Sequence, residues 1–588
     1  MKHFNVLFFI VLFGLSSCGD YLDRKNLDTF DESNFWTSES NMRLFVQGIY
    51  TAYFTGYGSG YSWGNYFTGG AWSDEYSSGS IWTQNTATSG NGWSFTYVRR
   101  ANLIIARADL LPESGETKEH WKGIGRFFRA MEYADLARAF GDVPWYDSEV
   151  LITDTELSYK QRDALEVVAT HIMEDFRYAA DHVRTDDGDQ QVNRDVVLAF
   201  MSRHLLYFGT FIKYHDLNTE VADQLLEGAV WAAKQLVDGG SYKVYDDYRG
   251  LFTSEDLGGN SEMILYRQYE EAKATHCLVS YNNQEAQTGI TLKMVETYLS
   301  SDGLPIRQSP LYDYSSDNGL RFYPGQFKNR DPRMAATLVD SVRISGAHTG
   351  YSSTGFPTLK FLPVDANSSE LKYLGSTNTT DAPVIRYGEV LLNYAEAAAE
   401  LGQFTQDIAD ETINRLRARN IPEANYQLPA MVVSGDQVLA NGVAIDDPAR
   451  DTSVSPLLWE IRRERCVELM FEGFRRNDLR RWKKYEYLKT VETNGPSTMG
   501  KGAYVDLRVF DAKTLAKVKK AVHFYYPEAG DTDHAFIYNL YDANMRRDWV
   551  AGDAYYERQY LNAVPLDQIK LYRDLGYELS QNPGWDTE

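Results

Sequence analysis

Aromatic side chains are concentrated in a polar stretch between residues 61 and 97, where tryptophans and tyrosines alternate with asparagines and carboxylates. Sugar rings present C–H faces that stack on aromatic rings, and their hydroxyls need amide and carboxylate partners. This mixture predicts a carbohydrate site. Its candidate residues in this stretch are Trp63, Tyr66, Trp72, Asp74, Trp82 and Asn85.

Within this stretch, Trp82 is the favoured ring for stacking, because it lies between glycine and asparagine turns. Trp93 directly precedes a helical pattern, which indicates core packing instead. Asp74 and Glu75 could together accept hydroxyl hydrogen bonds, although adjacent side chains point apart unless the loop bends.

A second contribution is expected from residues 263–285, where tyrosines alternate with polar residues. Tyr266 and Tyr281 are the candidates, and Tyr266 could instead be a strand residue that faces the core. Cys277, in the same stretch, is expected to be a buried thiol.

Signatures of catalysis are sparse in this sequence. It contains no glycine-rich phosphate loop, no Cys-x-x-Cys and no His-Glu-x-x-His. His204 and His215 lack neighbouring ligands in the sequence, so we expect core or solvated histidines and no metal site. The prediction is a protein that is not an enzyme and needs no cofactor.

Charge and cysteine content narrow the classes of partner. Lys+Arg 59 against Asp+Glu 82 gives a net charge of -23, which disfavours nucleic acid and favours a neutral ligand. Once Cys18 is set aside, only Cys277 and Cys466 remain, so packing rather than a disulfide framework must hold the fold.

The N-terminal residues have the form of a lipoprotein signal. An apolar run from Val6 to Leu15 follows Lys2 and ends at Ser16, Ser17 and Cys18. The run is too short to span a bilayer. Cleavage before Cys18 would remove residues 1–17 and leave Cys18 for lipid attachment, which would anchor the chain to a membrane.

Helical periodicity predicts the elements that position these segments. Apolar residues recur at helical spacing from about 99 to 240 and from 382 to 482, with glycines and asparagines at the expected ends. The pattern predicts tetratricopeptide-like helical hairpins, including one long helix over 457–482 whose mixed charges brace packing. Arg126, Arg129, Glu132 and Asp135 are expected to form pairs on a helix surface.

The fold class that follows is mainly α, with a helical-hairpin scaffold and a loop-rich irregular subdomain that carries short strands. No linker separates the two, so residues 18–588 are expected to form one unit. The ligand-binding regions would be the irregular stretches at about 55–98 and 241–380.

An ordered series of motifs gives the chain a family resemblance. These are CGDYLD at 18–23, GRFFRAMEYADLARAFGDVPWY at 125–146, SDGLPI at 301–306, NRDPRM at 329–334, APVIRYGEVLLNYAEAAAE at 382–400, IRRERCVELMFEGFRRNDLRRW at 461–482 and the ending QNPGW at 581–585. In this order the motifs resemble the SusD/RagB family of nutrient-binding lipoproteins.

The resemblance implies a lipid-anchored outer-membrane protein that faces outward from the cell. Its implied partners are an oligosaccharide or polysaccharide and a SusC-like TonB-dependent transporter, to which the glycan is delivered. The alternative is a peptide-binding RagB-like protein or a structural partner of the transporter. A surface glycoside hydrolase is a third reading, but a chain with 82 acidic residues always offers carboxylate pairs, so their number is no evidence for it.

Overall fold

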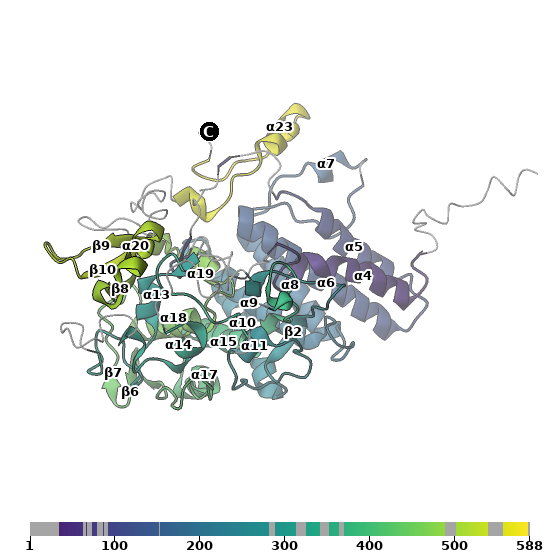
Figure 1. Cartoon of the computed structure of the whole chain (residues 1–588). Helices are drawn as coiled ribbons and strands as arrows, with labels where there is room; N and C mark the ends of the chain where they lie inside the picture. The colour runs from purple at the N-terminus through teal and green to yellow at the C-terminus, as the bar shows by residue number, and fades with distance from the viewer. Residues whose placement is uncertain are drawn as a thin grey trace, which may run out of the picture.

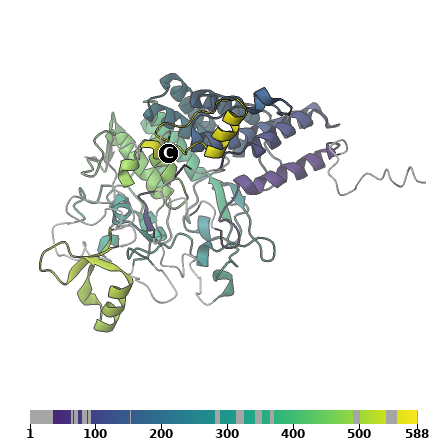
Figure 2. The same ribbon diagram turned by 90° about the horizontal axis from the view of Figure 1, so that it is seen from above.

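The computed structural model describes residues 35–62, 66, 73–78, 86–87, 92–151, 153–280, 288–312, 325–340, 352–363, 370–488, 501–538 and 557–585. Long helices from the first part of the chain pack side by side and form a helical half, and later segments form a loop-rich half beside it (Figure 1). Viewed from above, the hairpin of β9 and β10 projects from the loop-rich half, away from the helices (Figure 2). The predicted fold class is confirmed.

The helices have the following bounds: α4 (Glu39–Tyr53), α5 (Thr96–Ala108), α6 (Gly115–Phe140), α7 (Thr155–Ser158), α8 (Leu165–His182), α9 (Arg194–Tyr214), α10 (Thr219–Gly239), α11 (Gly250–Thr253), α13 (Leu292–Thr297), α14 (Pro332–Thr337), α15 (Tyr387–Glu400), α16 (Gln406–Glu411), α17 (Ile413–Arg417), α18 (Pro456–Glu468), α19 (Arg475–Arg481), α20 (Ala512–Ala521) and α23 (Leu566–Asp574).

Short antiparallel strands occur mainly in the loop-rich half. They pair as β1 (Tyr76–Ser78) with β3 (Thr288–Ile290), β2 (Met263–Arg267) with β4 (Ala382–Arg386), β6 (Gln437–Ala440) between β5 (Val432–Ser434) and β7 (Val443–Ala444), and β10 (His534–Tyr538) between β8 (Lys501–Asp506) and β9 (His523–Tyr525). The first two pairings join residues that are far apart in the sequence.

Polar caps and glycines set the ends of the helices where the sequence predicts them. The side chains of Ser114, Asn193 and Asn218 accept backbone N–H groups at the starts of α6, α9 and α10. Gly141 ends α6 with a φ of 72°, a left-handed conformation that favours glycine. These caps fix the hairpins α5–α6, α8–α9 and α9–α10.

Helix α9 is the core of the helical half. It is the one helix in the described part of the chain that is long and apolar enough to cross a membrane, but 89% of its apolar window is buried inside the protein. Gly209 and Gly228 let α9 and α10 approach closely, because an added Cβ would meet Leu226 at 2.8 Å and Leu205 at 2.7 Å respectively. Helix α9 is therefore a packed core helix.

The predicted single helix over 457–482 is wrong. Helix α18 ends at Glu468 and α19 starts at Arg475, with Phe471 at φ 63° and Gly473 at φ 85° between them. Phe471 is buried, so core contacts hold a conformation that a large side chain otherwise avoids. The break turns α19 away from the axis of α18.

Buried ion pairs surround this break and centre on Arg386, which is 1% exposed. Its guanidinium donates to Glu262 at 2.7 Å, to Glu468 at 2.9 Å and to Glu472 at 2.7 Å. Since Arg386 ends β4 and the two later glutamates flank the end of α18, the network joins the helical and loop-rich halves. The predicted bracing role of the charged motif at 461–482 agrees with these contacts.

The expectation of surface pairs along α6 is wrong for Arg129 and Glu132. Arg129 is buried and binds both carboxylate oxygens of Asp175 on α8, at 2.6 and 2.7 Å. Glu132 accepts the hydroxyl of Tyr53 from α4. Neighbouring helices cover this face of α6, which a one-helix pattern cannot reveal.

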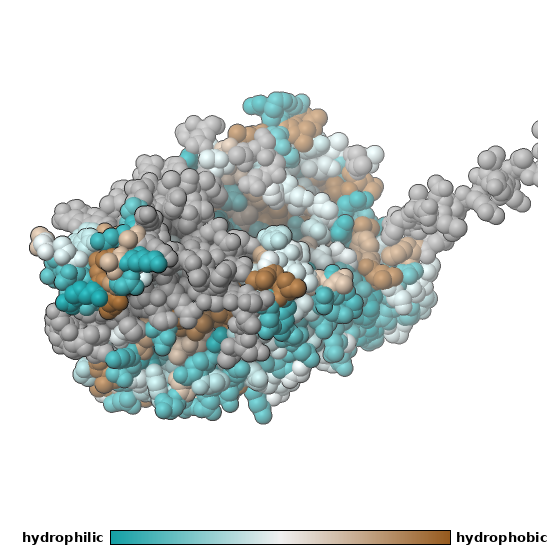
Figure 3. Space-filling view, in the orientation of Figure 1, coloured by the Kyte–Doolittle hydropathy of each residue, from teal (hydrophilic) through white to brown (hydrophobic). Residues whose placement is uncertain are grey.

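The chain's C-terminal residues clamp the end of α6. Asn582 donates to the carbonyl oxygens of Phe140 at 2.8 Å and Asn562 at 2.7 Å, and the indole of Trp585 donates to Leu561 at 3.1 Å. Beyond this clamp, α23 exposes apolar side chains, which form the brown patch at the top of Figure 3. These are Leu566, Leu571 and Leu575.

Candidate functional site

The aromatic stretch at 61–97 is attached to the protein body through Tyr66. This tyrosine is 8% exposed, contacts Tyr57 and Phe361 edge to face, and donates its hydroxyl to the carbonyl oxygen of Pro383 in β4. Burial raises the pKa of Tyr66 well above its usual value, so it remains a neutral donor. Tyr66 therefore supports the loop and has no open ring face for a sugar.

Asp74 makes the second attachment, with its carboxylate buried. Arg475 of α19 donates to its two oxygens at 2.6 and 2.9 Å, and Lys293 of α13 lies 2.9 Å away. Burial alone would raise the pKa of Asp74, but the charges of Arg475 and Lys293 outweigh it and hold the pKa below its usual range. Both oxygens are engaged by protein, so Asp74 positions the loop rather than facing a ligand.

The neighbouring residues complete this attachment. Thr291 donates its hydroxyl to the backbone oxygen of Asp74 at 2.7 Å, and Tyr76 starts the strand β1, which pairs with β3. Glu75 is also buried, and burial raises its pKa to about 8. The carboxylates of Asp74 and Glu75 are thus both enclosed, which contradicts a solvent-facing pair that accepts sugar hydroxyls.

Tyr266 is the candidate that the structure leaves partly exposed. It lies in β2 opposite Pro383 of β4, close to the attachment of Tyr66. Its hydroxyl accepts from the amide of Gln190 at 3.5 Å, and the same amide lies 3.3 Å from Gln268. The two glutamines and the phenol form a small polar group at the surface.

The remaining candidates lie outside the described residues. They are Trp63, Trp72, Trp82, Asn85 and Tyr281, together with the lipid-attachment residue Cys18. Two lesser expectations are supported: Cys277 is a buried thiol, and Trp93 packs edge to face on Phe95 and Phe140.

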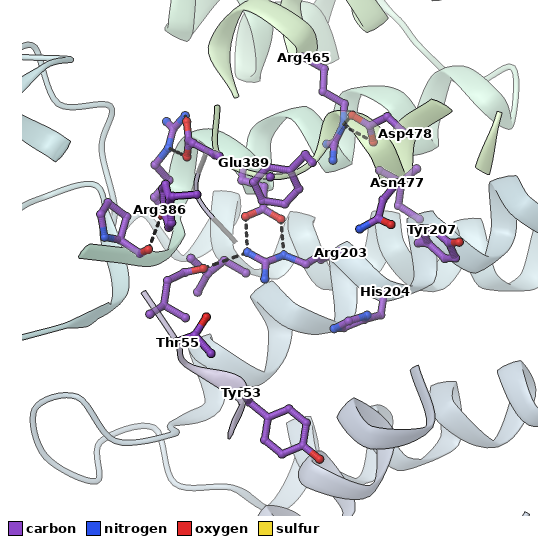
Figure 4. A pocket seen from close by; sticks show the side chains of 18 of the residues that line it. Tyr53, Thr55, Arg203, His204, Tyr207, Arg386, Glu389, Arg465, Asn477 and Asp478 are labelled. Atoms are coloured by element: carbon purple, nitrogen blue, oxygen red, sulfur yellow. Dashed lines mark hydrogen bonds and ion pairs between the residues drawn. The ribbon is translucent and has the colours of Figure 1, made fainter. Parts of the chain in front are cut away.

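A polar cavity of about 140 Å³ is lined by Tyr66 and by residues of α9, β4 and α19 (Figure 4). Arg203 crosses it and binds both oxygens of Glu389 at 2.6 Å, while donating to the carbonyl of Val384 at 3.1 Å. Arg465 similarly binds Asp478, at 3.0 Å. The charges that line the cavity are thus paired with one another.

Two neutral groups at one side of the polar cavity, the Nε2 atom of His204 and the hydroxyl of Tyr207, are buried without a hydrogen-bond partner among the described residues. The amide of Asn477 lines the same side (Figure 4). Burial lowers the pKa of His204 well below its usual value, so the ring is neutral. These groups suit a few water molecules or a small neutral polar molecule.

Sequence reasoning missed the polar cavity because its lining comes from segments far apart in the chain. His204 had a recognisable place on a helix, but nothing in the sequence brings it close to Asn477. The Arg203–Glu389 pair likewise joins residues with no local relation.

Glu39, His120 and Asp187 bring potential metal ligands within 4.8 Å of one another. The Nδ1 atom of His120 accepts the backbone N–H of Arg184 at 3.2 Å, so the ring carries its hydrogen on Nε2, which faces Asp187. Arg43 and Arg184 form ion pairs with the carboxylate of Asp187, at 2.6 Å and 3.2 Å. The tautomer and the two guanidiniums fit an ion-pair cluster better than a metal site.

The helical hairpins and the irregular half attached to them define a class of mainly α-helical protein. The model of the SusD family matches residues 262–585, more than half of the sequence. The chain therefore belongs to the SusD family, and the resemblance seen in the motifs is confirmed.

Individual relatives agree with this assignment. The SusD-like protein P38 of Formosa agariphila is 22% identical over 519 residues, which cover 84% of this chain and 93% of the relative. A SusD-like carbohydrate binding protein of Bacteroides fragilis is similar in structure, with a TM-score of 0.64, 21% identity, and coverage of 91% of this chain and 99% of the other. A laminarin-binding SusD-like protein is also similar in structure, with a TM-score of 0.52 and 17% identity. The match covers 93% of this chain and 100% of the other.

Proposed function

We propose that this protein captures an oligosaccharide or polysaccharide at the cell surface and delivers it to a SusC-like TonB-dependent transporter. The observation that carries the proposal is the double attachment of the aromatic stretch, through Tyr66 to β4 and through Asp74 to α13 and α19. A tryptophan-rich segment held to a rigid body suits ring stacking, because less freedom is lost on binding.

Family membership supports the same function. Two structural relatives carry descriptions as carbohydrate-binding or laminarin-binding SusD-like proteins. The net charge of -23 favours a neutral ligand over a phosphate-rich one. Binding without catalysis agrees with paired carboxylates such as Asp74, Glu389 and Asp478, which are held by arginines.

Affinity electrophoresis of the lipid-free protein against a panel of polysaccharides tests the proposal. We expect one polysaccharide to retard the protein, and Trp82→Ala to abolish the retardation because a stacking face is lost. Tyr526→Ala is the matched control, since Tyr526 is an exposed aromatic residue directly after β9 and outside the loop. No retardation by any glycan together with binding of peptides would replace the proposal with the RagB-like alternative.

Delivery needs a separate experiment. The full-length lipoprotein should copurify from detergent-solubilised outer membranes with a TonB-dependent transporter, and deletion of that transporter should stop uptake of the glycan while surface binding continues. Uptake that continues without any such partner would contradict delivery.

A further inference from the structure

A second cavity lies on the far side of the Asp74 attachment and is distinct from the polar cavity. It has a volume of about 390 Å³, which falls in the range of roughly 300–1,000 Å³ usual for small-molecule sites. It is bounded by α13, by residues 305–307, by residues 447–451, by α18 and by Tyr487. We call it the aromatic cavity, after the two rings described next.

The walls of the aromatic cavity combine flat rings with aliphatic groups. Trp459 and Tyr487 lie edge to face, with ring centroids 6.5 Å apart, and Pro305 and Ile306 face the same space. Both aromatic residues are partly exposed rather than buried in the core. Such walls bind a ring that presents C–H groups.

The rim of the cavity offers both hydrogen-bond donors and acceptors. Lys293 keeps 35% of its side chain exposed and lies over the ring of Tyr487, with its nitrogen 4.7 Å from the centroid. Arg307 and Glu296 pair at 3.0 Å, and Asp451 accepts the hydroxyl of Tyr487 at 2.7 Å. Positively and negatively charged side chains therefore surround the apolar walls.

This combination selects one class of ligand. Because the rim carries charges of both signs, a ligand with charge of one sign would meet like charges there, and a purely apolar ligand would bury polar groups without hydrogen-bonding them. Sugar hydroxyls donate and accept at once, so they can use the ammonium of Lys293 together with the carboxylates of Glu296 and Asp451. We propose that the aromatic cavity is a second carbohydrate subsite, which takes a neutral sugar ring.

The cavity shares two lining residues with the attachment of the aromatic stretch. Lys293 and Arg475 both line it, and both bind Asp74. An oligosaccharide bound beside this attachment can therefore extend into the cavity. The inference rests on the proposed function and adds a subsite to it.

Chemistry at the floor of the cavity agrees with reversible binding. Cys466 lines the cavity, and burial raises the pKa of its thiol to about 12, so it stays neutral. Its sulfur contacts the sulfur of Met294 at 3.5 Å. A neutral buried thiol is a poor nucleophile.

Calorimetry with an oligosaccharide series of the retained polysaccharide tests the subsite. We expect Trp459→Ala and Tyr487→Ala to weaken binding of the longer oligosaccharides by about tenfold, while the shortest bound oligosaccharide is unaffected. Tyr487→Phe keeps the ring and should bind nearly as the wild type does. Tyr526→Ala controls for loss of an exposed aromatic residue, and thermal unfolding confirms that each variant is folded.

A fluorescence measurement locates the ligand independently. Binding of a long oligosaccharide should change tryptophan emission, and Trp459→Phe should remove part of that change while most of the affinity remains. If the wild type and Trp82→Ala differ as proposed but both cavity variants bind every length like the wild type, the subsite is overturned and the proposed function stands. If the wild type binds no glycan, both fail.

Discussion

The carboxylate of Asp74 shows how one residue can connect a loop to two helices. It forms ion pairs with Arg475 on α19 and with Lys293 on α13. Removing one partner of a buried ion pair leaves uncompensated charge, which is why such changes are costly.

Asp74→Asn should therefore lower the free energy of unfolding by about 3 kcal/mol. It should also weaken glycan binding, because the aromatic stretch loses an attachment. Urea denaturation and affinity electrophoresis measure the two effects. Asp574→Asn is the control, since Asp574 is exposed and pairs with Lys570 across one helical turn, where water screens the pair and the loss should be far smaller. Equal losses in the two variants would contradict the anchoring role.

Glu75 gives the stability of the protein a pH dependence. Its pKa is raised to about 8 in the folded state, above the ordinary value of 4.5, because burial penalises the charged form. The unfolded chain therefore releases this proton at lower pH than the folded chain does. The contribution of Glu75 to stability falls as pH rises from about 4.5 to about 8 and is constant above that.

Glu75→Gln should remove this dependence, because the amide stays neutral at every pH. We expect the variant to match the wild type near pH 4 and to melt at a higher temperature near pH 9. Thermal unfolding across this range measures the difference. A variant that tracks the wild type at both ends would show that Glu75 does not titrate between them.

At the scale of elements, the break between α18 and α19 decides where the charged side chains point. Glu468 and Glu472 both bind Arg386, while Arg475 turns toward Asp74. A continuous helix would place Arg475 on the same face as Glu472, three positions earlier, so the break is what separates their partners. The break therefore connects the ion-pair network to the attachment of the loop.

Gly473→Ala should destabilise the protein by about 1–2 kcal/mol, because φ is 85° there. Gly48→Ala is the matched control: Gly48 lies within α4 with nothing within 4 Å of an added Cβ, so the change should stabilise by roughly 0.5–1 kcal/mol. Denaturant titrations compare the two. Stabilisation by both changes would mean that the break is not constrained.

Local pattern predicted the helices well where caps and periodicity agree, as at Asn193 and Gly141. It failed where distant contacts override it. Phe471 adopts a left-handed conformation because of buried surroundings, and Tyr66 is buried because its hydroxyl meets a carbonyl 317 positions away in the sequence. Loop composition indicated a carbohydrate site, but it could not separate rings that support the loop from rings that face a ligand.

At the scale of the whole molecule, the proposed lipid attachment at Cys18 would determine where the protein acts. Cys18→Ala should prevent acylation and release the protein from the membrane fraction. Metabolic labelling with palmitate and cell fractionation measure this outcome. Cys277→Ala is the control, because Cys277 is a buried thiol within the folded body and its loss should leave anchoring intact. Membrane retention of Cys18→Ala would contradict lipid attachment at this residue.

The two attachments at Tyr66 and Asp74 have an evolutionary consequence. They divide the long connection between α4 and α5 into shorter stretches of sequence, one between Tyr66 and Asp74 and another between β1 and α5. Shorter spans cost less entropy to close. Substitutions within either span leave both attachments in place, so ligand preference can diversify among descendants of this chain while the scaffold is inherited unchanged.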